Sequence, residues 1–366
     1  MCGVKAPSRL TLLLGHATWM ALGVLALRAV ASPPEPVKAP PPEPATPAYE
    51  KLVAFFAPPP TPSGTPAPED TEARIALGRM LFFDARLSKN HDVSCNTCHD
   101  LATNGADREA VSRGHLGRKG RRNSPTVYNV GGYVAQFWDG RAPTLEIQAE
   151  GPLFEPSEMA MPDDKRVLAT LTSMPEYVKR FQEAFPGEKK PVTLANLTRA
   201  LAAFQRQLTT PSRFDQFLAG QQEALSPQER RGLELFVTTG CITCHGGPAV
   251  GGTSLQKLGL VEPYPRDTDP GRYEVTREEE DRMKFRVPTL RNVEKTAPYL
   301  HDGSVAGLDE VVRVMARYQL GKTLSPAQVE ELVAFLRSLT GELPARYLAP
   351  PELPKSTRKT PRPDPT

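Results

Sequence analysis

The spacing of apolar side chains along the chain predicts a mainly helical protein. In several stretches apolar residues recur every three or four positions, which places them on one face of an α-helix. One such helix begins after Asp70 or Thr71, either of which can cap it, and another begins near Thr193. The apolar positions are Ile75, Ala76, Met80 and Leu81 in the first helix, and Leu194, Leu197, Leu201, Phe204 and Leu208 in the second. Few stretches alternate in the manner of a β-strand.

Two further helix starts carry the same four-residue signal. Ser226-Pro227-Gln228-Glu229 and Ser325-Pro326-Ala327-Gln328 both combine a capping box with proline at the first helical position. The second opens a helix with Val329, Leu332, Val333, Leu336 and Leu339 on one face.

The two ends of the chain have a different composition. Residues 1–31 have a basic start, an apolar run and the small residues Ala29-Val30-Ala31, which predicts a cleaved signal peptide. An uncleaved membrane anchor is the alternative, because the run reaches the short end of membrane-spanning length. Residues 32–68 hold 14 of the 39 prolines, which predicts an extended linker, and Leu52 to Phe56 within them either docks on the body or remains part of the linker. Residues 350–366 are again proline-rich and polar, which predicts a disordered tail.

Between these ends the chain repeats itself. Gly78-Arg79-Met80-Leu81-Phe82 matches Gly232-Leu233-Glu234-Leu235-Phe236, and Pro125-Thr126-Val127-Tyr128-Asn129-Val130 matches Pro288-Thr289-Leu290-Arg291-Asn292-Val293. Trp138-Asp139-Gly140 and His301-Asp302-Gly303 follow at the same offset. We therefore expect two tandem domains related by duplication, at residues 69–215 and 216–349.

Each half contains one cysteine motif with a histidine directly after it. Cys95-Asn96-Thr97-Cys98-His99 and Cys241-Ile242-Thr243-Cys244-His245 have the spacing that attaches a c-type haem, with the histidine as iron ligand. A zinc site or a disulfide is the alternative, but the adjoining histidine is not the usual zinc-ligand spacing, and a redox Cys-x-x-Cys requires no histidine. The motifs predict two haem groups in a mainly α protein of two cytochrome c-like domains.

The charge balance gives no sign of a nucleic-acid partner. The chain has 45 basic and 42 acidic residues, and without the three basic residues of the predicted signal peptide the two counts are equal. A nucleic-acid-binding domain is instead expected to carry a strong basic excess.

The pattern leaves open which residue provides the second axial ligand of each haem iron. Met315 lies on a predicted helix after Leu308 and is a candidate ligand of the second haem, although a core methionine is the simpler interpretation. His115 lies in a glycine-rich, basic loop and is a candidate ligand of the first haem, although a surface histidine explains it equally well.

The chain resembles the bacterial di-haem cytochrome c peroxidases from about Gly78 to Gly321. The resemblance rests on both haem motifs and on many ordered matches, among them Leu81-Phe82-Phe83-Asp84, Asn123-Ser124-Pro125-Thr126, Gln136-Phe137-Trp138-Asp139-Gly140-Arg141-Ala142, Glu158-Met159, Asp269-Pro270-Gly271-Arg272 and Thr296-Ala297-Pro298-Tyr299. So many matches in order are more specific than haem attachment alone.

The resemblance implies a role for each matched residue. His115 is implied to be a displaceable ligand of the first, peroxide-reacting haem, with Gln148 and Glu158 as the distal pair. Trp138 is implied to lie between two haems that face a shared interface, and Met315 to be the sixth ligand of the second haem. A calcium site is implied at Asn123 and the backbone carbonyls of Thr296 and Pro298.

The resemblance also implies the reaction, the partners and the compartment. We expect a periplasmic enzyme that reduces hydrogen peroxide with electrons from a cytochrome c or a cupredoxin. The resemblance also makes a homodimer an expected form of the protein. One alternative is a related oxidase of the methylamine dehydrogenase maturation type, in which tyrosine takes the position of Met315. The other is a non-catalytic di-haem electron carrier, which would not explain Gln148 and Glu158.

Overall fold

The computed structural model describes residues 53–56, 69–266 and 268–366. The predicted signal peptide and most of the predicted linker lie outside the described residues. Within those ranges, no helix is long and apolar enough to cross a membrane.

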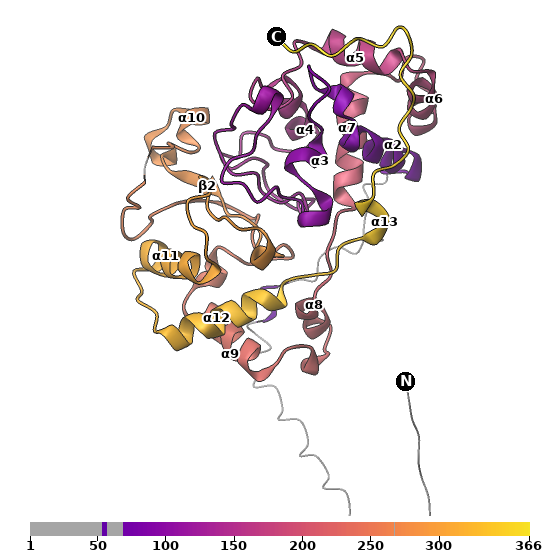
Figure 1. Ribbon diagram of the computed structural model, residues 1–366. Coiled ribbons are helices and arrows are strands. Elements are labelled where there is room, and N and C mark those ends of the chain that lie inside the picture. The colour runs from indigo at the N-terminus through magenta and orange to yellow at the C-terminus, as the bar shows by residue number, and fades with distance from the viewer. Residues whose placement is uncertain (1–52, 57–68, 267) are drawn as a thin grey trace, which may run out of the picture. The chain divides into compact units, whose positions relative to one another are not determined.

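The described chain is mainly helical, as the apolar periodicity predicts (Figure 1). The first half contains α2 (Glu72–Phe83), α3 (Cys95–Cys98), α4 (Leu145–Phe154), α5 (Asp164–Thr172), α6 (Pro175–Ala184) and α7 (Leu194–Arg206). The second half contains α8 (Arg213–Leu218), α9 (Pro227–Thr238), α10 (Tyr273–Thr276), α11 (Leu308–Leu320), α12 (Pro326–Ser338) and α13 (Ala345–Leu348). Two short strands, β1 (Leu255–Lys257) and β2 (Lys284–Arg286), pair antiparallel with Leu255 opposite Arg286.

The helix starts agree with the predicted capping residues. Thr71 caps α2 through a hydrogen bond from the Arg74 backbone, whereas Asp70, the other candidate, forms an ion pair with Arg206 at 2.5 Å. Thr193 caps α7, and both predicted capping boxes are present at the starts of α9 and α12.

The two halves are built on the same helix crossing. α2 packs on α7 in the first half, and α9 packs on α12 in the second. The repeated glycines lie at these contacts. A Cβ on Gly78 would overlap the carbonyl oxygen of Ala200, and a Cβ on Gly232 would overlap the carbonyl oxygen of Glu331. The repeat seen in the sequence therefore preserves the residue that lets two backbones approach closely.

Substitution of either crossing glycine by alanine is expected to destabilise its own half. The added methyl forces the helices apart, at about 1–3 kcal/mol for overpacking, which outweighs the roughly 1 kcal/mol that alanine gains in helix propensity. Thermal unfolding of Gly78→Ala and Gly232→Ala tests this. Gly132→Ala is the control, because nothing lies within 4 Å of the position of its Cβ. Unfolding temperatures equal to that of the unsubstituted protein would contradict the close crossing.

A polar contact at the junction joins the two repeats. The Thr210 hydroxyl accepts hydrogen bonds from the side-chain amides of Asn129 at 2.8 Å and Asn292 at 2.9 Å. These two asparagines occupy equivalent positions in the repeat, and all three residues are buried. Thr210 therefore fixes the equivalent turns of both repeats to one atom.

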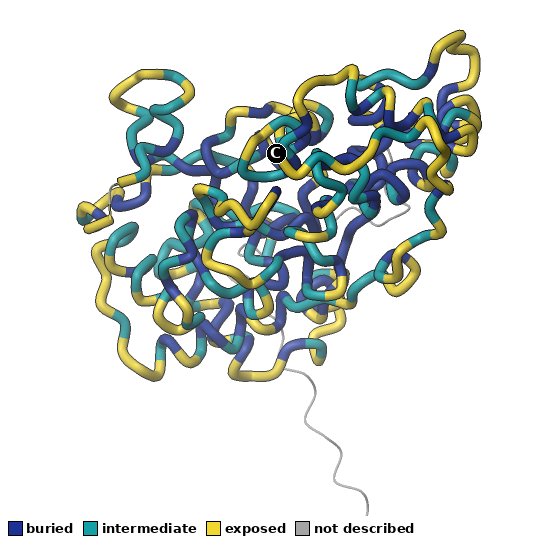
Figure 2. Tube along the Cα trace, turned by 45° about the horizontal axis from the view of Figure 1, so that its top comes forward, coloured by how far each residue is buried: buried dark blue, intermediate teal, exposed yellow. Residues whose placement is uncertain are grey.

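The end of the chain differs from the predicted disordered tail. After α12 the chain returns to the first half, where Tyr347 packs in the core and residues 350–366 follow the surface of α5 and α6 (Figure 1). Arg86 donates to the carbonyl oxygen of Pro354 at 2.7 Å, and Arg166 donates to that of Arg362 at 2.6 Å. Most of the segment is exposed, although Pro354 within it is buried (Figure 2). Arginine side chains satisfy its backbone, so it has neither helix nor strand yet is held in place.

The apolar run in the predicted linker docks on the second half. Phe56 is buried against Phe214 and Phe236, with ring centroids 5.1 and 6.4 Å away. The carbonyl oxygen of Phe55 accepts a hydrogen bond at 2.9 Å from the backbone of Gly247, two residues after the second haem motif. Of the two interpretations of this run, the structure supports docking.

Candidate functional site: two cavities, one at each cysteine motif

The first cysteine motif folds into a single helical turn. Ser94 begins α3 with a capping box, in which its backbone donates to the hydroxyl of Thr97 at 3.0 Å. Cys95 and Cys98 are three positions apart and therefore share a face of the turn. His99 ends it, and its Nδ1 lies 3.3 Å from the carbonyl oxygen of Gly105. That contact orients the ring as carbonyl groups commonly orient iron- and zinc-bound histidines.

The second motif forms a similar turn with a different entry. Gly240 adopts a left-handed conformation with φ of 101°, and the turn spans Cys241–Thr243. The backbone of His245 donates to the carbonyl oxygen of Cys241 at 3.0 Å, as the backbone of His99 does to Cys95 at 2.9 Å. Both histidines therefore leave their motif in the same way.

The protonation states suit haem attachment. Burial lowers the pKa of His99, and lowers that of His245 to about 4, so both imidazoles are neutral and can bind iron. Burial raises the pKa of Cys95 to about 12 and of Cys98 to about 11. Neither motif forms a disulfide, so all four thiols are free for attachment, and the histidine that directly follows each pair is the residue that favours the haem interpretation.

Both motifs open onto cavities with the lining that a haem requires. The first cavity has a volume of about 570 Å³ and is lined by Cys95, Cys98 and His99, and the second has about 230 Å³ and is lined by Cys241, Cys244 and His245. The second cavity is lined mostly by apolar side chains, whereas the first combines apolar residues such as Phe82, Val93 and Leu201 with polar and charged ones, so each offers apolar surface to a porphyrin face. The described residues therefore fit one haem c in each half.

The first cavity brings together the predicted distal pair. Gln148 lies on α4, whose start is capped by Thr144, and Glu158 lies just beyond that helix. Burial and the neighbouring carboxylate of Glu155 raise the pKa of Glu158 to about 6. A carboxyl group with that pKa exchanges protons readily near neutral pH.

His115 is not among the residues that line the first cavity. Its side chain is buried, its Nδ1 lies 3.8 Å from a carboxylate oxygen of Asp92, and neither ring nitrogen has a hydrogen-bond partner among the described residues. Its backbone nevertheless donates to the carbonyl oxygen of Glu158 at 2.7 Å. The structure thus places His115 next to the distal residue by its backbone, with the imidazole outside the cavity.

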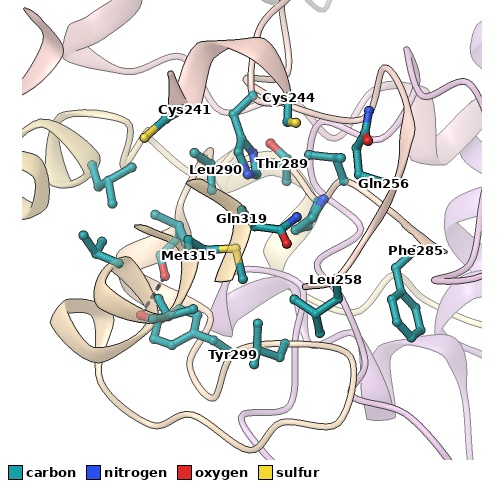
Figure 3. Close-up of a pocket in the computed structure, with 18 of the residues that line it drawn as sticks. Cys241, Cys244, Gln256, Leu258, Phe285, Thr289, Leu290, Tyr299, Met315 and Gln319 are labelled. Carbon is teal, nitrogen blue, oxygen red and sulfur yellow. Dashed lines mark hydrogen bonds between the residues drawn. The ribbon is translucent and has the colours of Figure 1, made fainter. Parts of the chain in front are cut away.

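Met315, the predicted ligand of the second haem, is among the residues that line the second cavity. Figure 3 shows its thioether extending from α11 into the space between Cys244, Tyr299 and Gln319. Of the described residues that line this cavity, none is a carboxylate, whereas Glu155 and Glu158 both line the first. The two cavities therefore differ in the titratable groups that line them, although the two halves repeat the same sequence pattern and helix crossing.

Trp138 lies where the two cavities meet. It lines both, and its indole Nε1 donates to the carbonyl oxygen of Asn123 at 2.8 Å. Its ring centroid lies 6.4 Å from that of His301, which stacks on Phe285 at 4.1 Å. The tryptophan predicted to lie between the haems thus lines the boundary between their cavities.

The three residues predicted to bind calcium all line the second cavity. They are Asn123, Thr296 and Pro298, and the side-chain amide of Asn123 donates to the carbonyl oxygen of Glu109 at 2.9 Å. The described residues contain no group of three or more His, Cys, Asp or Glu placed to hold a metal ion. The predicted ligands are instead amide and carbonyl oxygens, a type that calcium accepts.

Sequence reasoning missed the arginines around the cavities. Arg122 precedes the predicted calcium ligand and bonds Asp269 and Asp139, both at 2.6 Å, and so joins the two halves. Arg286 is buried and lines both cavities. Arginines are common surface residues, and neither position has a periodic or motif signal, so only the fold reveals them.

Comparisons with known proteins agree with this geometry. Residues 72–223 match the model of the di-haem cytochrome c peroxidase family. The chain is 46% identical to cytochrome c551 peroxidase of Nitrosomonas europaea, over 79% of this chain and 86% of that protein, and 46% identical to that of Pseudomonas aeruginosa, over 80% and 85%.

A solved structure supports the same assignment. The chain superposes with a TM-score of 0.69 on the crystal structure of a MauG-like protein associated with microbial copper homeostasis, at 31% identity over 81% of this chain and 96% of that one. The paired haem cavities, the sequence matches and the shared fold lead to one conclusion: this chain belongs to the di-haem cytochrome c peroxidase family.

Proposed function

We propose that this peroxidase reduces hydrogen peroxide at the first cavity with electrons that a small redox carrier delivers to the second. The observation that carries the proposal is the difference between the cavities. The first holds the titratable Glu158 and the amide of Gln148, and the second holds the thioether of Met315 with no carboxylate in its described lining. Proton transfer therefore belongs to the first cavity and electron entry to the second.

Two haem c groups, which the family carries, supply the electron transfer and the reduction of peroxide when bound. His99 and His245 would hold the two irons, with Met315 as the second ligand in the C-terminal half. A thioether ligand raises the potential of a haem, which suits a site that accepts electrons first.

The distal residues move protons and orient the substrate. Reduction of one peroxide to two waters consumes two electrons and two protons, so a proton must reach the departing oxygen. Glu158, with a pKa of about 6, accepts the first proton from peroxide as a base and returns it as an acid. Gln148 orients peroxide through its amide. Trp138, at the boundary of the cavities, couples the two halves.

The remaining features of the proposal come from the resemblance. Asn123, Thr296 and Pro298 hold a calcium ion where the halves meet. The enzyme acts in the periplasm after export directed by residues 1–31, or stays at the membrane if that segment is not removed, and it forms a homodimer. The donor is a cytochrome c or a cupredoxin.

A steady-state assay tests the proposed reaction. The holoprotein with peroxide and a reduced cytochrome c or cupredoxin is expected to oxidise two carrier molecules for each peroxide consumed. A related oxidase would instead modify a protein substrate and oxidise neither carrier. A plain electron carrier would exchange electrons with the donor but leave peroxide intact, and either result would overturn the proposal.

His115 is proposed to gate the first cavity by leaving and re-entering it. Leu116, with a φ of 55°, is in a left-handed conformation that is strained for a residue other than glycine, and a movement of the loop that releases this strain agrees with gating. The fully oxidised holoprotein is expected to show a low-spin first haem that becomes high-spin after one-electron reduction. His115→Ala is expected to be high-spin in both states by electron paramagnetic resonance. A high-spin first haem in the oxidised unsubstituted protein would contradict gating.

A further inference from the structure

A guanidinium buried between the two cavities lacks a counter-charge. Arg286 ends β2, is only 2% exposed and lines both cavities. Its Nη1 has no hydrogen-bond partner among the described residues. No carboxylate of the described chain pairs with it, and the Tyr133 hydroxyl is the group that interacts with its charge.

The rest of this side chain is firmly held. Its Nε donates to the carbonyl oxygen of Phe137 at 3.3 Å, and its guanidinium lies 4.3 Å from the ring centroid of Tyr133. The backbone of Arg286 donates to the carbonyl oxygen of Trp138 at 2.7 Å. The guanidinium is therefore fixed beside the boundary tryptophan, with one nitrogen left over.

The other deeply buried arginine shows what is missing. Arg291 is fully buried, and its Nη1 and Nη2 bond the carboxylate of Asp215 at 2.8 and 2.7 Å. Burying a guanidinium without a carboxylate is strongly unfavourable, so a partner for Arg286 is expected from outside the polypeptide. Burial also lowers the pKa of Arg286, as it does for a cation without a nearby anion.

The remaining arginines of the first cavity already have carboxylate partners. Arg122 and Arg141 both pair with Asp139, and Arg121 pairs with Glu274. None of these three lines the second cavity. Among the described arginines that line either cavity, Arg286 is thus the one without a carboxylate and the one shared by both.

We propose that Arg286 binds a haem propionate at the boundary of the two cavities and thereby raises the potential of that haem. A propionate is the anionic group that a haem brings into such a cavity, and the planar guanidinium matches a carboxylate. Because Arg286 lines both cavities, the carboxylate can belong to either haem, or one from each can share the guanidinium. The proposal rests on the presence of two haems and not on the peroxidase reaction.

Redox titration of the Arg286→Gln holoprotein, followed spectroscopically for each haem without peroxide, tests this. Loss of the cation favours the oxidised iron, so the potential of the haem whose propionate it binds is expected to fall. The released propionate then takes up a proton near neutral pH, which adds a pH dependence absent from the unsubstituted protein. A change at the first haem, the second or both identifies the source of the carboxylate.

Arg272→Gln is the matched control. Arg272 also bonds across the boundary, to the carbonyl oxygens of Asp139 at 3.2 Å and Gly140 at 3.1 Å, but it lines neither cavity. Its loss is expected to leave both potentials unchanged. Unchanged potentials and pH dependence in an Arg286→Gln protein with both haems attached would overturn the proposal.

A second variant, Arg286→Lys, tests the proposal if the Arg286→Gln protein does not fold. Arg286→Lys keeps the charge as a single point but cannot form the paired hydrogen bonds of a guanidinium. The potentials are expected to stay near those of the unsubstituted protein, while the propionate bending bands in the resonance Raman spectrum shift. Bands identical to those of the unsubstituted protein would overturn the proposal. Because neither experiment uses turnover, both are independent of the proposed peroxidase mechanism.

Discussion

Glu158→Gln is expected to lower peroxide-dependent turnover by about 10²–10⁴-fold while both haems remain attached. General acid–base catalysis contributes on that order, and glutamine cannot accept or return a proton. Its similar size preserves the cavity wall, so the loss is expected in kcat. Steady-state rates with a reduced carrier measure the loss. Turnover close to that of the unsubstituted protein would remove Glu158 as the proton-transfer group.

The pH profile distinguishes proton transfer from a structural role. The pKa of Glu158 is raised to about 6, so the carboxylate that accepts a proton predominates above pH 6 and is lost as the pH falls through that value. Turnover of the unsubstituted protein is therefore expected to fall on the acid side of about pH 6. The residual activity of Glu158→Gln is expected to lack this limb.

Glu155→Gln is the matched control for that profile. Glu155 lines the same cavity, and its negative charge helps to raise the pKa of Glu158. Without it, Glu158 is expected to ionise at lower pH, so the acid limb moves down while turnover at neutral pH is retained. A limb that does not move would show that another group titrates.

Met315→His is expected to lower the potential of the second haem by on the order of 0.1 V or more. The choice of axial ligand alone spans roughly 0.8 V among haem proteins, and a thioether lies toward the high end. Electron entry from the carrier is expected to slow accordingly. A redox titration that resolves both haems measures the change, which is expected at the second haem only.

Met283→Leu provides the control for that titration. Met283 is buried in the cluster of Trp138, Leu258 and Phe285 against which Met315 packs, but it does not line the second cavity. Its substitution alters the packing around Met315 but leaves the thioether of Met315 itself in place, so both potentials are expected to be unchanged. A Met315→His protein with an unaltered second potential would exclude Met315 as a ligand.

Much of the fold follows from local sequence signals. The capping residues Thr193, Ser226 and Ser325 and the apolar periodicity predict helices that the structure contains, because these signals act within one turn of the chain. The repeated glycines predict equivalence of the halves, and Gly78 and Gly232 do lie at equivalent helix crossings.

Features that depend on distant contacts could not be predicted in this way. Residues 350–366 have a composition typical of disorder, and they are held only because arginines far away in the sequence, such as Arg86 and Arg166, bond their carbonyl oxygens. The predicted second half, residues 216–349, likewise ends with α13 packed against the first core. The composition of a segment describes only its own residues, so it cannot predict that another part of the chain provides a surface on which the segment docks.

The candidate site likewise contains some residues that the sequence predicts and others that only the fold reveals. Cys95, Cys98 and His99 follow from spacing alone, since attachment of a haem needs those residues in that order. Arg286 has no such signal, because its importance comes from lying between two cavities that only the assembled fold creates. His115 matches the family in residue type and position, and only the fold shows that its buried side chain is not among those that line the first cavity.

The central claim is that the two halves have different tasks, and ligand binding to the half-reduced holoprotein tests it most directly. After one-electron reduction, a small added ligand such as cyanide is expected to bind the haem of the first cavity alone, as followed by electron paramagnetic resonance for the ferric first haem and by optical absorption for the ferrous second haem. The Met315→His protein identifies the spectrum of the second haem. Binding to the second haem, or to both haems equally, would contradict the division of tasks.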